Sequence, residues 1–79
     1  MSGREEFAKA LRAKLEVPSD VKEGIRFRVF AAAYKQIISG VDKYNYIMTM
    51  ARNNDRLGEE GKEALKEIRD MPEYKAWTE

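Results

Sequence analysis

The chain contains neither cysteine nor histidine among its 79 residues. Without cysteine it has no disulfide, no thiolate metal ligand and no cysteine nucleophile, which fits an intracellular protein better than a small secreted one. Without histidine it lacks the usual general base at neutral pH and the commonest metal ligand. An enzyme would have to rely on carboxylates such as Asp42 or Glu63. We therefore expect a non-enzymatic protein with no catalytic residue, no metal site and no cofactor.

Long apolar runs are also absent. No stretch approaches the roughly 20 apolar residues of a membrane span or the shorter core of a signal peptide, and residues 1–6 are largely polar. We expect a cytoplasmic protein with no membrane partner. The 43% of hydrophobic residues is too high for a disordered polymer, and the length suits one domain with a modest core.

The clearest pattern present is an apolar stripe of helical period that runs from Val29 to Ala51. It predicts one long central helix over 28–52, bent near Gly40, with a length of about 37 Å at 1.5 Å per residue. Just before it, residues 24–30 alternate like a strand, so a short strand there is the alternative.

Shorter helices are predicted on both sides of the central one. Ser2 and Glu5 form a capping box for a first helix that ends near Glu16. A third apolar stripe covers residues 57–71, and Pro72 suits the first turn of a final short helix docked through Trp77. The sequence thus predicts an all-α single domain over residues 1–79. The expected core is Phe7, Leu11, Leu15, Val29, Phe30, Ala33, Ile37, Val41, Tyr44, Met48, Leu65 and Ile68.

The face opposite the central stripe is the candidate binding surface. On a helical wheel it brings together Arg28, Lys35, Lys43, Tyr46 and Met50. Residues 20–56 carry seven basic and four acidic side chains, whereas residues 57–79 carry a net negative charge. Cationic groups beside exposed apolar side chains suit a protein surface, so we expect a regulator or inhibitor that acts by protein–protein binding.

The central stripe is longer than the flanking helices can cover. We therefore expect a homodimer or larger assembly that uses Tyr44, Ile47 and Met48. A nucleic-acid partner is the alternative function, because basic and aromatic side chains share the central segment.

One short string gives a minor alternative. Residues 35–41, which read Lys-Gln-Ile-Ile-Ser-Gly-Val, resemble the Gln-x-Val-x-Gly loop of cystatins, the inhibitors of papain-like cysteine proteases. The resemblance implies an α+β fold in which Gln36, Ile38 and Gly40 form an inhibitory hairpin. The charged helical stretch at 59–71 and the alanine run at 31–33 depart from that family's pattern.

Overall fold

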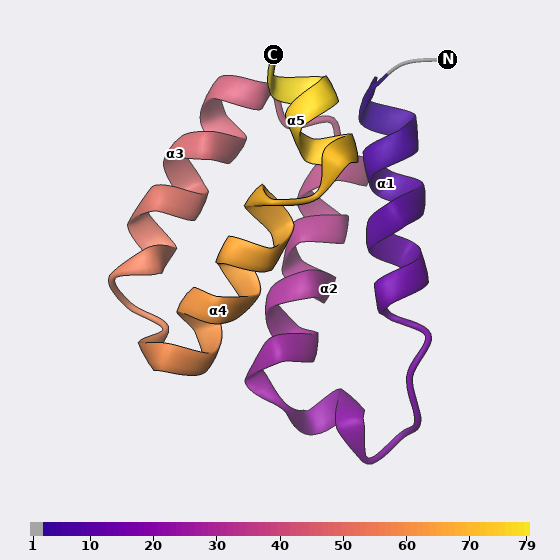
Figure 1. Cartoon of the computed structure of the whole chain (residues 1–79), viewed down its shortest axis with the longest axis vertical. Helices are drawn as coiled ribbons and strands as arrows, with labels where there is room; N and C mark the ends of the chain where they lie inside the picture. The colour runs from indigo at the N-terminus through magenta and orange to yellow at the C-terminus, as the bar shows by residue number, and fades with distance from the viewer. Residues whose placement is uncertain (1–2) are drawn as a thin grey trace.

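A computed structural model describes residues 3–79, and within this range the chain forms five α-helices and no strand (Figure 1). The all-α class predicted from the sequence is confirmed. A single 3-10 turn, η1 (Val21–Glu23), precedes the second helix. The helices are α1 (Gly3–Lys14), α2 (Ile25–Ile38), α3 (Lys43–Asn54), α4 (Gly58–Arg69) and α5 (Pro72–Thr78).

Helix α2 lies at the centre of the arrangement, between α1 and α4 (Figure 1). Helix α3 packs on the far side of α4, and α5 crosses beside the start of α1, so the two ends of the chain lie near each other. No helix in residues 3–79 combines the length and the apolar character that crossing a bilayer requires.

The strand alternative at residues 24–30 is wrong, and so is the cystatin-like hairpin. Residues 25–38 are helical, because the alanines at 31–33 favour helix and an established helix extends cooperatively through the alternating segment before them. Gly24, in extended conformation, is the N-cap of α2. The predicted capping box of Ser2 and Glu5 includes a residue outside the described range.

The prediction of one long helix over 28–52 is also wrong, because the chain turns sharply between α2 and α3. Gly40 has a φ of 88°, a left-handed conformation that glycine adopts at little cost. The Gly40 amide donates to the Ile37 carbonyl, and the Val41 amide donates to the Gln36 carbonyl, which together form a Schellman motif that ends α2. Two residues later the Asp42 carboxylate accepts a 2.8 Å hydrogen bond from the Asn45 amide and begins α3.

This turn changes which side chains of the third helix are buried. Tyr44 and Met48 were expected in the core but are exposed, whereas Tyr46 and Met50 are buried. The four residues between the helices restart the helical phase, so the apolar spacing of α2 does not continue into α3. Leu15 and Val41 are only half-buried, and the other eight expected core residues are buried as predicted.

An aromatic cluster joins α1, α3 and α5. The Phe7 ring lies with its centroid 5.8 Å from that of Tyr46, 5.5 Å from that of Tyr74 and 5.7 Å from that of Trp77. Docking of the final helix through Trp77 is therefore confirmed. Above the cluster, Arg4 lies over the Trp77 ring and donates a 2.8 Å hydrogen bond to the Val41 carbonyl. The turn between α2 and α3 is thus fastened to α1.

Glu67 of α4 links three helices. Its carboxylate pairs with Arg26 of α2 at 2.6 Å and with Lys14 of α1 at 3.4 Å. Partial burial alone would raise the pKa of Glu67, but the hydrogen bonds and charges of Arg26 and Lys14 outweigh it and hold that pKa below its usual value. The acidic surface of α4 therefore has a structural role.

Candidate protein-binding groove

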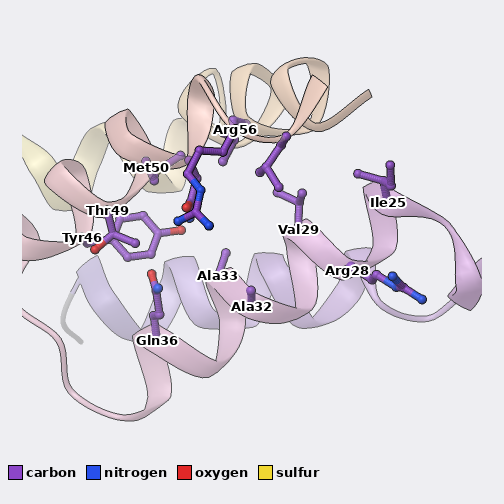
Figure 2. A pocket seen from close by; sticks show the side chains of 13 residues that line it. Ile25, Arg28, Val29, Ala32, Ala33, Gln36, Tyr46, Thr49, Met50 and Arg56 are labelled. Carbon is purple, nitrogen blue, oxygen red and sulfur yellow. The ribbon is translucent and has the colours of Figure 1, made fainter. Parts of the chain in front are cut away.

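A groove runs between α2 and α3 and has α4 beneath it (Figure 2). The two helices each pack on α4 but not closely on each other, which leaves a cavity of about 380 Å³ open to solvent. That volume is within the range of ligand pockets in proteins, roughly 300–1,000 Å³. The lining residues are Ile25, Arg28, Val29, Ala32, Ala33, Gln36, Tyr46, Thr49, Met50, Asn53, Arg56, Leu57 and Leu65.

Small side chains on α2 keep the groove open. Ala32 and Ala33 occupy the middle of this wall, and neither reaches across to α3 (Figure 2). On the opposite wall, Tyr46 and Met50 are one turn apart, so both face inward when the helix begins at Lys43. The alanines that favour helix in the sequence therefore also create the space between the helices.

Tyr46 closes one end of the groove and carries an unsatisfied polar atom. The residue is 0% exposed, and its hydroxyl has no hydrogen-bond partner in the described part of the chain. Burial, and to a lesser degree the nearby Tyr74, raises the pKa of the Tyr46 hydroxyl far above its usual value, so this group is a neutral donor at physiological pH. Leaving a buried hydroxyl unpaired costs about 1–3 kcal/mol.

Two guanidinium groups border the groove on opposite sides. Arg56, in the turn after α3, extends into the groove, while Arg28 stands on the α2 side and points toward solvent (Figure 2). Both residues are exposed, and within residues 3–79 neither forms an ion pair. The lining contains no carboxylate. The site therefore combines apolar walls, a buried neutral donor and uncompensated positive charge.

The structure brings together three of the five residues predicted to contact a partner. Arg28, Tyr46 and Met50 line the groove, whereas Lys35 and Lys43 are exposed and do not. The expectation that Tyr46 and Met50 are exposed is wrong, because the turn between α2 and α3 changes which side of α3 faces the core. The groove has further lining residues that the pattern did not indicate, among them Gln36, Asn53 and Arg56.

The residues predicted for self-association lie on the other side of α3. Tyr44 is 70% exposed, and Ile47 and Met48 are exposed as well. Their spacing of three and four residues places them on one strip of the helix, away from Tyr46 and Met50. Helix α3 therefore has one apolar side in the core and a second apolar side in solvent.

The acidic side chains of the described residues are spread out and do not gather at one metal site. No group of three or more aspartate or glutamate side chains there is arranged to hold a metal ion. A second, smaller cleft is lined by Arg26, Glu60, Glu63, Ala64 and Glu67, where Glu67 already pairs with Arg26. The lining of the groove between α2 and α3 contains no such ion pair.

Comparison of the chain with models of known protein families, with curated proteins and with solved structures finds no match in any of the three.

Proposed function

We propose that this protein is a non-enzymatic protein-binding domain that regulates or inhibits its partner by holding a segment of it between α2 and α3. The observation that carries the proposal is the groove itself, whose apolar walls, unpartnered Tyr46 hydroxyl and unpaired arginines lie together. A bound protein segment covers the apolar walls and neutralises Arg28 and Arg56. No group already in the described chain meets these needs.

The residue types at the site are those that contribute strongly to protein interfaces. Tyrosine, arginine and methionine are enriched there, and a few such residues in a desolvated pocket provide most of the binding free energy. Met50 adds a flexible side chain that adapts its shape to an occupant. Apolar area removed from water contributes about 25 cal/mol per Å² before the cost of association.

The geometry favours a protein over a nucleic acid. Duplex recognition uses a row of cations along the phosphate backbone, whereas this site has two guanidiniums around a deep apolar cavity. Binding to a nucleic acid would weaken steeply as salt rises, because each neutralised phosphate releases counterions. Measuring retention of the protein on heparin and on duplex DNA across a salt series separates the two classes.

The test of the proposal begins with a photo-crosslinking amino acid at Ala32, which is exposed within the groove. The same amino acid at Ala13, exposed on α1, is the matched control. Crosslinking in the native cell followed by mass spectrometry should identify a protein captured from Ala32 and not from Ala13. That protein is then purified for direct titration.

The titration compares the wild-type protein with Ala32→Trp, which fills the groove, and with Ala13→Trp, which adds the same side chain elsewhere. Ala32→Trp should weaken binding at least about tenfold, equivalent to 1.4 kcal/mol, while Ala13→Trp should leave it nearly unchanged. Equal affinity of both variants for the partner would show that the groove is not the binding site. Circular dichroism confirms that both variants are folded.

A further inference from the structure

We infer that the occupant of the groove is an acidic amphipathic α-helix of about three turns. The inference rests on the proposed function and specifies the chemistry of the partner. It follows from the length of the groove, from the backbone hydrogen bonds already formed within its walls, and from the placement of Arg28 and Arg56.

The length of the groove fits a short helix. Its α2 wall runs from Ile25 to Gln36, a distance of about 16 Å at 1.5 Å per residue. The opposite wall, from Tyr46 to Leu57, includes the same number of residues. A bound helix of eleven residues covers this length in about three turns.

The groove walls favour a helix over an extended peptide. An extended segment needs partners for its backbone amides and carbonyls, which it usually finds at the edge of a sheet. Both walls here are helices whose backbone groups already bond within themselves, and only Gln36, Thr49 and Asn53 offer neutral polar side chains besides Tyr46. A helix forms its backbone hydrogen bonds within itself and presents only side chains. It therefore loses no backbone hydrogen bond when it enters an apolar groove.

Packing considerations lead to the same occupant. Helices α2 and α3 both rest on α4 without packing closely on each other, so a helix laid between them completes a layer over α4. Ala32 and Ala33 offer little bulk at the middle of one wall, which allows the backbone of the incoming helix to approach closely. Its apolar side chains at i, i+3, i+4 and i+7 would lie over Val29, Met50 and Leu65.

The polar groups define the rest of the occupant. Because Arg28 and Arg56 stand on opposite sides of the groove, the helix should carry carboxylates on both flanks of its apolar stripe.

The experiment is a selection from a random library of peptides about sixteen residues long, displayed against the full wild-type protein. We expect enriched peptides to carry apolar residues at helical spacing and an excess of aspartate and glutamate. Selected peptides are synthesised and titrated against the wild type and variants. Compared with the wild type, affinity should fall about tenfold or more in Ala32→Trp and several-fold in Arg28→Glu and Arg56→Glu.

Matched controls are Ala13→Trp for bulk and Arg12→Glu for charge, since both positions are exposed and outside the groove. Each should change affinity by less than about twofold. Far-ultraviolet circular dichroism of the peptide should show helix gained on binding. Arg28→Gln and Arg56→Gln repeat the charge test if a reversal disturbs the fold.

The outcomes separate the inference from the proposed function. Peptides that respond to Ala32→Trp but are neutral, basic or extended overturn the inference and leave the groove as a binding site. Peptides that bind Ala32→Trp as well as they bind the wild type overturn the proposed function itself. If the wild type self-associates and Ala32→Trp does not, the occupant is a second copy of this chain, and the inference is wrong.

Discussion

Tyr46 combines two properties that rarely occur together in one residue. Its ring packs among Phe7, Tyr74 and Trp77 in the aromatic cluster, and its hydroxyl is buried without a partner in the described residues. Most buried hydroxyls find a hydrogen bond, so an unpaired one points to a function or to a partner not yet present. The ring stabilises the fold, while the hydroxyl faces the groove.

Replacing Tyr46 by phenylalanine should separate these roles. At neutral pH the variant should be as stable as the wild type or about 1 kcal/mol more stable, because the change removes an unsatisfied polar atom and retains the ring. Urea unfolding followed by circular dichroism measures this difference. A loss of more than about 1 kcal/mol would show that the hydroxyl has a stabilising partner in the folded chain.

The pH dependence of the same variant gives an independent check. The folded-state pKa of Tyr46 is raised above its unfolded value of 10.0, so its contribution to stability is fully present below pH 10 and is lost as pH rises above it. Unfolding free energy of the wild type should fall by up to about 1.4 kcal/mol per pH unit from this residue alone. The fall should be shallower in Tyr46→Phe, whereas Tyr44→Phe, with an exposed ring, should follow the wild type.

Glu67 should contribute a small electrostatic stabilisation with the opposite pH dependence. Because its pKa is lowered in the folded state, the contribution is present above its usual pKa of 4.5 and is lost as pH falls through the folded value. The ion pairs are partly exposed, so Glu67→Gln should cost no more than about 1 kcal/mol at neutral pH and nothing in strong acid. Thermal unfolding at both pH values, with Glu63→Gln as control, tests this, and an equal loss at both would contradict it.

At the scale of the element, the sequence predicted helices where a single uninterrupted apolar period exists. The stripe at 57–71 became α4, and Pro72 opened α5, because each has one face to bury and a clear boundary. The turn at residues 39–42 was missed because the apolar residues on both sides share a helical period by coincidence. The sequence does carry a signal for this turn. Gly40 is a residue type that ends helices, Val41 supplies the apolar contact that often follows such an end, and Asp42 is an N-cap for the next helix.

Missing this turn also determined how much of the site could be predicted. The exposed position of Arg28 follows from the phase of α2 alone and was predicted correctly. Tyr46 and Met50 were predicted as contact residues, but whether their side chains are buried depends on where α3 begins. Arg56 enters the groove only through the tertiary placement of the turn after α3, which no local pattern encodes.

The turn itself should be sensitive to substitution at Gly40. Alanine at a φ of 88° is strained, so Gly40→Ala should lower the unfolding free energy by about 1–2 kcal/mol. Gly40→Asn is the matched control, since asparagine enters the left-handed region more readily than alanine does. Chemical denaturation compares the two variants. Equal effects would mean that the left-handed conformation is not required.

At the scale of the whole molecule, the chain exposes more surface than a monomer of its mass usually does. Its accessible surface is 5365 Å², compared with about 4,900 Å² expected for a 9.2 kDa protein. Two features contribute apolar area to this surface, the groove between α2 and α3 and the outer strip of α3 formed by Tyr44, Ile47 and Met48. The two lie on different sides of α3, so one copy of the chain can offer two independent contacts.

We propose that the outer strip of α3 pairs with the same strip of a second copy. A two-fold contact uses one self-complementary patch on both chains, and an apolar helix face suits it because burial requires no charged partner. Sedimentation equilibrium at micromolar concentrations should show a dimer for the wild type and a monomer for the double variant Tyr44→Ser with Met48→Ser. Both residues are exposed, so circular dichroism of the variant should not change.

Two controls define the surface responsible for this pairing. Ile38→Ser removes an apolar side chain that is 59% exposed at the end of α2, and it should leave the dimer intact. Ala32→Trp fills the groove on the other side of α3 and should also leave it intact. A wild type that sediments as a monomer would reject the pairing, and loss of the dimer only in Ala32→Trp would move the contact to the groove. Persistence of the dimer in both controls and its loss in the Tyr44 and Met48 variant would make α3 a helix that uses one face for folding and the other for assembly.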